Sequence, residues 1–184
     1  LMTRSTVEVP TQDDEATQQR LRRQIAYCLK TPFYSELFER HSIDPTKIRT
    51  LEDVRNMPVL VTPEIHRQAQ EASVDRDGHP FGTYLAAPVE DVISVSSTSG
   101  TTGTPTLYAF TVHDVAVTDK LWQRALRFVG VDPGDCVLQG FGLSMYLAGL
   151  PLVRALERMG ARPVPIGAEA GAEKLLRMAR MVRP

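Results

Sequence analysis

A run of hydroxyl and glycine residues at positions 96–106, SSTSGTTGTPT, carries the clearest chemical signal in the sequence. Gly100 and Gly103 can adopt positive φ angles and allow a ligand to approach the backbone closely. Successive N–H groups in such a loop form a concave surface that favours an anion, and hydroxyl groups add donors without bulk. The run therefore predicts a binding site for a chain of phosphate groups. The residues predicted to line it are Thr98, Ser99, Gly100, Thr101, Thr102, Gly103, Thr104 and Thr106.

Two other interpretations compete for this run. Segments rich in Ser, Thr and Gly often serve as flexible linkers, but here the apolar runs at 92–95 and 107–110 flank the segment directly. The nucleoside-triphosphate loop GxxxxGK[ST] needs a lysine after its second glycine and a helix downstream, whereas this chain continues with Thr104 and Pro105. We therefore expect antiparallel strands near 92–97 and 105–110. The loop between them should be mobile without ligand, because it has few groups to pack.

The rest of the sequence predicts helices and short strands around this hairpin. Thr11 and Asp14 resemble a capping box at the start of a helix that Thr31 and Pro32 end. Further helices are predicted from the caps Thr62 and Thr111, from about Tyr146 to Gly160, and over 175–182, with strands at 136–138 and 162–166. Segments that alternate in this way predict a parallel sheet with helices packed on it.

Composition places the chain among ordinary globular proteins. Of its 184 residues 42% are apolar, and 21 basic residues balance 22 acidic ones, giving a net charge of −1. No long-range field therefore favours nucleic acid or an anionic membrane as a partner. Cys28 and Cys136 are far apart and in no metal-ligand spacing, which is typical of reduced thiols in a cytoplasmic protein.

The motif SGTTGxP at 99–105 resembles the phosphate-binding signature of the adenylate-forming superfamily, the acyl- and aryl-CoA ligases and their relatives. The preceding segment, with PFG at 80–82 and Pro88, and Thr106 after the proline make the chain similar to the phenylacetate-CoA ligase branch. The resemblance runs from about Tyr27 to Pro184 and is most specific at the hydroxyl-rich loop.

This resemblance implies an α/β fold: the N-terminal portion of the large domain of an adenylate-forming enzyme. A helical N-terminal region would precede the β-hairpin phosphate loop and the alternating helix and strand units. Residues 1–10 are expected to be a disordered tail, and 11–184 an N-terminal part of the adenylation domain, incomplete at its C-terminal end because family members are much longer. Helices in the last third should then leave apolar surface uncovered.

The activity implied is ATP-dependent conversion of an aryl or arylacetic carboxylic acid, through an acyl-adenylate, into its CoA thioester. ATP, Mg²⁺ and CoA would be required, and a homodimer is compatible with the resemblance. In the superfamily the catalytic lysine and the ribose and metal ligands lie beyond position 184. No catalytic or metal-binding residue is therefore assigned, and the 184-residue piece alone is expected to be inactive.

The resemblance also assigns the loop GFGLSMY at 140–146. It implies that Phe141, Gly142 and Tyr146 line the acid pocket, as an apolar slot suited to an arene. From the residues alone, the favoured interpretation is that the two aromatics are core residues at the start of a helix. Ser94 and Ser96 depart from the branch, where Arg and His are common, and so leave the acid's identity open.

Two other functions fit the same residues. An adenylating enzyme could pass its acyl group to a carrier-protein thiol or to an amine instead of CoA. The chain could also be a non-catalytic remnant that serves as a binding or interaction module. The intact hydroxyl set at 98–104 favours a working phosphate site.

Overall fold

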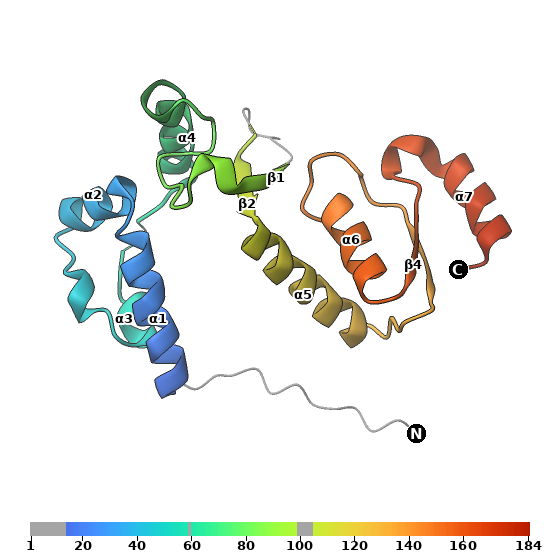
Figure 1. The fold of residues 1–184 in the computed structure, drawn as a ribbon, viewed down its shortest axis with the longest axis horizontal. Coiled ribbons are helices and arrows are strands. Elements are labelled where there is room, and N and C mark those ends of the chain that lie inside the picture. The colour runs from blue at the N-terminus through green and yellow to red at the C-terminus, as the bar shows by residue number, and fades with distance from the viewer. Residues whose placement is uncertain (1–13, 59, 99–104) are drawn as a thin grey trace. The chain divides into compact units, whose positions relative to one another are not determined.

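The computed structural model describes residues 14–58, 60–98 and 105–184 (Figure 1). The chain forms two units, of which the first comprises residues 1–77 and 82–86, and the second 78–81 and 87–184. Within the described residues, no helix is long and apolar enough to cross a membrane.

The first unit is helical. Its elements are α1 (Glu15–Cys28), α2 (Pro32–Arg40), a 3₁₀ turn (Pro45–Lys47), α3 (Leu51–Arg55) and α4 (Pro63–Asp77). Asp14 is the N-cap of α1, and its carboxylate accepts from the N–H of Thr17 at 2.7 Å. Thr11, the predicted start of the capping box, lies outside the described residues. Helix α1 ends at Cys28, three residues before the predicted stop at Thr31, and Thr31 is the N-cap of α2. The predicted cap at Thr62 is confirmed by its hydroxyl, which accepts from Ile65 N at 3.2 Å.

A small aromatic core holds this first unit together. Phe33 and Leu37 of α2 are buried against Ala69 of α4. The ring of Phe33 packs edge-on against Tyr84, with centroids 5.5 Å apart. The unit is therefore a helical scaffold whose core is local to it.

The second unit begins with the predicted hairpin. A 3₁₀ turn (Val89–Asp91) leads into β1 (Val92–Ser97), which pairs antiparallel with β2 (Leu107–Thr111), so that Val95 lies opposite Ala109. Thr111 and Asp114 form a capping box at the start of α5 (Val112–Phe128). The helix ends before Gly130, whose φ of +90° favours glycine.

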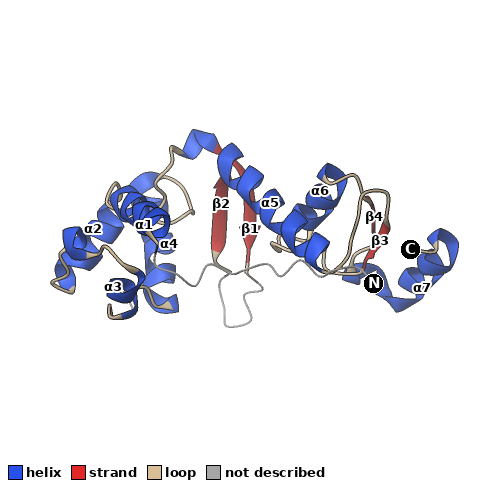
Figure 2. Cartoon of the chain, turned by 90° about the horizontal axis from the view of Figure 1, so that it is seen from below, coloured by secondary structure: helices blue, strands red, loops and turns tan. Residues whose placement is uncertain are grey.

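A parallel strand pair follows, as predicted. The remaining elements are β3 (Cys136–Gln139), α6 (Leu150–Arg158), β4 (Arg162–Pro165), a 3₁₀ turn (Ala168–Ala170) and α7 (Gly171–Val182). Strands β3 and β4 pair in parallel (Figure 2), with Leu138 opposite Val164. Leu156 and Met159 of α6 form a buried core with Ala161. A right-handed β–α–β crossover is the usual way to make such a pair.

The predicted start of α6 near Tyr146 is wrong. The helix begins at Leu150, and residues 140–149 form a loop. This start places Pro151 in the first turn, where its missing N–H costs nothing. A helix from Tyr146 would have placed the same proline in its interior.

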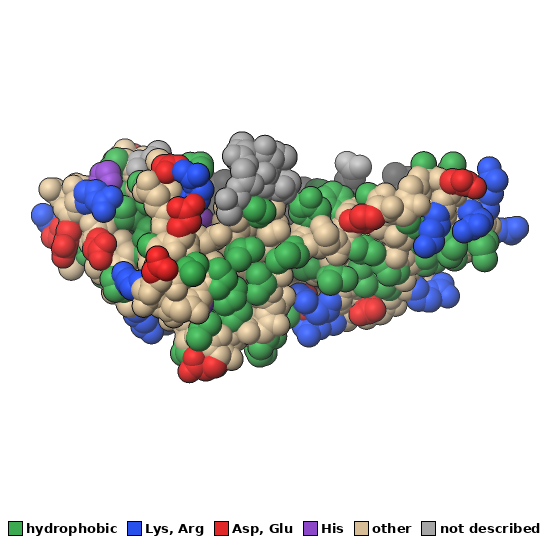
Figure 3. Space-filling model, turned by 90° about the horizontal axis from the view of Figure 1, so that it is seen from above, with side chains coloured by type: hydrophobic (Ala, Val, Ile, Leu, Met, Phe, Trp, Pro, Cys, Tyr) green, Lys and Arg blue, Asp and Glu red, His purple; other side chains and the backbone are tan. Residues whose placement is uncertain are grey.

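Large apolar side chains are exposed in the second unit. Helix α7 has no buried residue among those described, and Leu176 and Met181 are 58% and 69% exposed. Phe128 and Val129, at the end of α5, are 79% and 73% exposed. Figure 3 shows apolar side chains in green between charged groups on one face of the molecule. The expectation of uncovered apolar surface in the last third is confirmed for α7.

Candidate functional site

The described ends of the hydroxyl-rich loop are held together by a pair of threonines. Thr98 N donates to Thr106 O, and Thr106 N donates to Thr98 Oγ1, both at 3.0 Å. Thr98 is exposed and continues the hairpin beyond the strands. Of the eight predicted phosphate ligands, these two are brought together. The other six (Ser99, Gly100, Thr101, Thr102, Gly103 and Thr104) and the predicted mobility of the loop lie outside the described residues.

The hairpin and the 140–149 loop meet directly. The backbone N–H of Ser97, the last residue of β1, donates to the carbonyl of Met145 at 2.7 Å. These positions are far apart in sequence, and the sequence predicted a role for both segments. The hydrogen bond places the base of the candidate phosphate loop beside the candidate acid pocket.

Gln139, at the end of β3, anchors the far end of this loop. Its side-chain amide donates to the carbonyls of Ala148 and Gly149 at 3.1 and 3.2 Å, and the residue is 4% exposed. The backbone of Gly149 is enclosed, because a Cβ atom there would lie 2.8 Å from the carbonyl oxygen of Gly142. The backbone of the loop therefore leaves no room for a side chain at Gly149.

Glu169, in the 3₁₀ turn after β4, holds the middle of the loop. Its carboxylate accepts from Leu143 N at 3.1 Å. Hydrogen bonds from its own backbone N–H, from Leu143 and from Ser144 lower the pKa of this carboxyl group. The charged form of Glu169 is therefore the form that fixes the loop.

The three predicted pocket residues lie together on this loop. The rings of Phe141 and Tyr146 meet edge to face, with centroids 6.4 Å apart and planes at 80°. Gly142 lies beside them: a Cβ there would lie 3.3 Å from the Tyr146 ring and 3.2 Å from Glu169 Oε1. Phe141 is 53% exposed, so in this structure it is not a core residue. An open aromatic face of this kind can contact a flat or branched apolar group.

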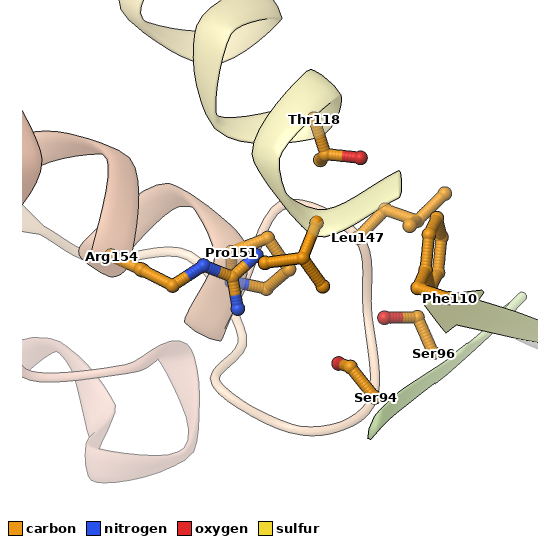
Figure 4. A pocket seen from close by; sticks show the side chains of 8 residues that line it. Ser94, Ser96, Phe110, Thr118, Leu147, Pro151 and Arg154 are labelled. Carbon is orange, nitrogen blue, oxygen red and sulfur yellow. The ribbon is translucent and has the colours of Figure 1, made fainter. Parts of the chain in front are cut away.

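A small pocket lies behind the same loop (Figure 4). It is lined from β1, β2, α5, α6 and the loop itself, by Ser94, Ser96, Phe110, Val115, Thr118, Leu147, Pro151 and Arg154. Ser94 and Ser96 are the two departures noted in the sequence, and the structure brings them together. About one water-sized sphere fits inside the pocket.

Beside this pocket a buried ion pair joins α5 to α6. Asp119 is 1% exposed, and Arg154 Nε donates to its Oδ1 at 2.8 Å. Arg158 forms an ion pair with the other carboxylate oxygen. Because Leu150 and Pro151 begin α6, this pair also fixes the end of the 140–149 loop.

Sequence reasoning missed Gln139, Glu169, Asp119 and Arg154. A glutamine that ends an otherwise apolar run was a signal for Gln139, since a buried amide must find partners. Arg154 and Arg158 are four residues apart, and therefore lie on one helix face. Nothing in the sequence pointed to Glu169, whose contact with Leu143 spans 26 residues.

Metal-ligating side chains do not gather in the part of the chain that the structure describes. There, no three His, Cys, Asp or Glu residues lie close enough together to hold a metal ion. Cys28 and Cys136 are both free thiols.

Known proteins resemble this chain in sequence and in structure. No model of a protein family matches it. The phenylacetate-coenzyme A ligase of Thermus thermophilus is 33% identical over 150 residues, which are 81% of this chain and 31% of that protein. The Escherichia coli enzyme of the same name is 29% identical over 153 residues, or 83% of this chain and 32% of its own length.

Solved structures of an acid–CoA ligase resemble the chain as well. A 2-hydroxyisobutyryl-CoA ligase in the postadenylation state, in complex with 2-HIB-AMP, matches with a TM-score of 0.76 and 29% identity, over 92% of this chain and 34% of that one. The same ligase with 2-HIB-AMP and CoA in the thioesterification state gives a TM-score of 0.75 and 31% identity, with the same coverage.

The chain thus spans about a third of the length of the relatives that it matches. Its described fold, with the helical unit, the hairpin and the parallel strand pair, matches the N-terminal part of an adenylate-forming enzyme. By sequence and fold together, the chain matches the N-terminal part of phenylacetate-CoA ligases and of a 2-hydroxyisobutyryl-CoA ligase, which are enzymes of the adenylate-forming type.

Proposed function

We propose that the protein containing this chain is an ATP-dependent acid–CoA ligase that works through an acyl-adenylate. This chain would supply the loop that holds the triphosphate and one wall of the acid pocket. The observation that carries the proposal is the hydrogen bond from Ser97 N to Met145 O, which joins the two segments. A nucleotide phosphate and a carboxylic acid bound by these segments would lie side by side, as adenylate formation requires.

The chemistry brings two anions together, because the carboxylate must attack the α-phosphate of ATP. Hydroxyl and backbone N–H donors in the loop at 98–106 would stabilise the β- and γ-phosphates without a fixed positive charge. Pyrophosphate could then leave after the first step. Thr98 would serve mainly as an anchor, since its Oγ1 already accepts from Thr106 N; its hydroxyl proton remains available to a phosphate oxygen.

The acid itself is proposed to be an aryl or arylacetic acid. Support comes from the exposed edge-to-face pair of Phe141 and Tyr146 and from relatives named phenylacetate-coenzyme A ligase. A branched 2-hydroxy acid is the second candidate, because the similar solved structures are of a 2-hydroxyisobutyryl-CoA ligase. CoA is the proposed acceptor, supported by the neighbour solved with CoA.

The remaining parts of the proposal concern Mg²⁺, location and residue roles. Mg²⁺ enters as the companion of ATP, and no described residue is assigned to it. The six loop residues at 99–104 keep their proposed role as phosphate ligands on sequence grounds. A cytoplasmic location is proposed from the two free thiols, Cys28 and Cys136. Residues 11–184 are proposed to be part of one adenylation domain.

The test is acid-dependent exchange of labelled pyrophosphate into ATP by the intact protein. We expect exchange with phenylacetate or a substituted benzoate, weaker exchange with 2-hydroxyisobutyrate, and formation of the CoA thioester when CoA is added. If none of the aryl, aliphatic and hydroxy acids in a panel supports pyrophosphate exchange, the proposed function is refuted. Exchange followed by transfer to a carrier protein but not to CoA would refute the proposed acceptor alone.

A further inference from the structure

The parallel strands β3 and β4 leave two edges of their sheet open. Within the described part of the chain, each of these strands pairs only with the other. Parallel sheets normally contain more strands and are covered on both faces, because a two-stranded sheet is only marginally stable by itself. One of the two edges is therefore expected to receive a further strand, and the direction of the backbone groups distinguishes between them.

The free edge of β4 is closed by two prolines. The N–H of Arg162 donates to the carbonyl of Asp135 at 2.7 Å, and so points toward β3. Backbone groups alternate in direction along a strand, so that Pro163 and Pro165 occupy the positions of β4 that face away from β3. Proline has no N–H to donate, and in sheets it is confined to edges. A further strand therefore cannot complete a ladder of hydrogen bonds on this side.

The free edge of β3 carries both donors and acceptors. The carbonyl of Gln139 accepts from Ile166 N at 3.1 Å, so the backbone groups of Gln139 face β4. By the same alternation, the N–H and C=O groups of Cys136 and Leu138 point toward the free edge. This edge can therefore pair with another strand.

The position of α7 indicates the same edge. Val137 packs against the core of α6, on one face of the strand pair. A Cβ atom on Gly140, directly after β3, would lie 3.2 Å from Leu175 of α7, and Figures 1 and 2 show α6 and α7 on opposite sides of the pair. Crossovers between parallel strands are right-handed. Because α7 lies on the face opposite α6, a right-handed crossover through α7 leads back past β3 to its free edge.

We propose that the free edge of β3 binds a parallel strand from the part of the protein that follows α7, so that β3 lies between β4 and this added strand. The chain spans about a third of the length of its relatives, so a protein of their length has the residues to supply it. The added strand should be rich in Val, Ile or Leu, because α6 and α7 would cover its two faces.

The added strand has a consequence for the candidate site. The carboxyl ends of parallel strands lie at one edge of a sheet, and ligands of open α/β sheets bind beyond those ends. The loop that follows the added strand would therefore lie beside the 140–149 loop and form a second wall of the acid pocket. This consequence rests on the proposed function, whereas the pairing on β3 does not.

Residue-resolved hydrogen exchange on the intact protein tests the pairing. The N–H of Leu138 should exchange at least about a hundredfold more slowly than in an unfolded peptide of the same sequence. It should be protected as well as the N–H of Gln139, which faces β4. Rapid exchange at Leu138 would overturn the proposal. Protection that is lost on dilution would also overturn it, because a second copy of the chain would then occupy the edge.

Proline variants of the intact protein give an independent measurement. Leu138→Pro removes a donor from the free edge, and Leu138→Ala is the matched control that keeps the donor. We expect Leu138→Pro to unfold at a much lower temperature than Leu138→Ala, or not to fold at all. Equal midpoints would overturn the proposal, because position 138 would then tolerate proline as an edge position does.

The edge of β4 serves as the second control. The variant Pro163→Ala restores an N–H that faces away from β3, and this N–H should exchange rapidly in the intact protein. Protection at position 163 without protection at Leu138 would place the further strand on β4 and overturn the proposal. None of these measurements requires ligase activity, so their outcome is independent of whether the proposed function is correct.

Discussion

At the scale of single residues, the hydroxyl groups of the loop are the most direct target. Replacing Thr101 and Thr102 by Val in the intact protein keeps the side-chain shape and removes two donors. Each lost hydrogen bond to a charged oxygen should cost about 1.5–3 kcal/mol, roughly ten- to a hundredfold in the rate of adenylate formation. Pyrophosphate exchange should therefore fall steeply.

The second half-reaction serves as the internal control for these variants. Thioester formation from pre-made acyl-adenylate has no pyrophosphate to hold and should be far less affected. Thr17→Val, on α1, is a matched change outside the candidate site. Equal losses in both half-reactions would mean that the two threonines are structural.

Glu169 gives a residue-scale prediction that depends on pH. Its pKa is lowered by hydrogen bonds from its own N–H, Leu143 and Ser144, so its charged form binds the loop best. A lowered pKa means that this stabilisation is complete above the ordinary glutamate pKa, about 4.3, and is lost as the pH falls through the folded value. The variant Glu169→Gln should be less stable than the parent near neutral pH.

The difference between parent and Glu169→Gln should shrink as the pH falls below that window. Unfolding midpoints measured from pH 7 downward, at intervals of about half a unit, would show this convergence. Glu173→Gln, on α7, is the matched control and should give a parallel curve. If the unfolding midpoints of Glu169→Gln and the parent differ by the same amount at every pH, the role given to the carboxylate is contradicted.

At the scale of elements, Gly149 decides whether the 140–149 loop can close. A Cβ there would lie 2.8 Å from Gly142 O and 3.0 Å from Ser144 O, both backbone atoms that cannot rotate away. Gly149→Ala should cost about 1–3 kcal/mol of stability and raise KM for the acid.

A strained glycine elsewhere separates loop closure from general destabilisation. Gly130 has a φ of +90° and open space around it. Gly130→Ala should therefore cost about 1 kcal/mol through strain alone, without changing KM for the acid. If both variants raised KM equally, the loop would not be the cause.

The ion pair between α5 and α6 predicts an asymmetry between its two sides. Asp119 is nearly fully buried, whereas the side chains of Arg154 and Arg158 are 29% and 51% exposed. Removing both arginines, as Arg154→Leu/Arg158→Leu, leaves a buried carboxylate alone and should cost roughly 3–5 kcal/mol. Asp119→Leu leaves two arginines that can turn to water and should cost less.

Urea unfolding of both variants would measure this order. Lys120→Leu, next to Asp119 but exposed, controls for the added apolar side chain. An Asp119→Leu variant less stable than the double arginine variant would show that the carboxylate organises α6 by more than charge balance.

These elements also show what could be predicted from sequence. Caps such as Thr111 with Asp114 depend on hydrogen bonds between neighbours three residues apart, so local sequence determines them. The hairpin could be predicted because its two strands and the loop between them are continuous in sequence. The predicted start of α6 near Tyr146 was wrong. Pro151 could have corrected it, because proline is favoured in the first turn of a helix.

The candidate site could be predicted in part, because the residues proposed to bind the ligands lie in two short continuous segments, 98–106 and 140–146. Its supports do not lie in such segments: Arg154 meets Asp119 across 35 residues, and Glu169 meets Leu143 across 26. Contacts of this kind depend on how α5, α6 and β4 pack, and no local pattern encodes that packing. The pocket at Ser94 and Ser96 became visible only when the fold brought these elements together.

At the scale of the whole molecule, the exposed face of α7 bears on the proposed domain. Leu176 and Met181 are 58% and 69% exposed in the 184 residues, and the chain spans about a third of the length of its relatives. If residues 11–184 are part of a larger adenylation domain, this face should be covered there. Burying each side chain would contribute about 1.5–3 kcal/mol.

The double variant Leu176→Lys/Met181→Lys should therefore behave differently in two lengths of the protein. In the 184-residue chain the change should alter the unfolding free energy by no more than about 0.5 kcal/mol and reduce binding of an apolar dye. In a protein of the relatives' length it should cost several kcal/mol, because two charges would replace buried apolar groups. Glu173→Lys, on the same helix, should be close to neutral in both lengths. A double variant that is neutral in the longer protein would mean that α7 keeps its apolar face in solvent, and that residues 11–184 do not share a core with the rest of the domain.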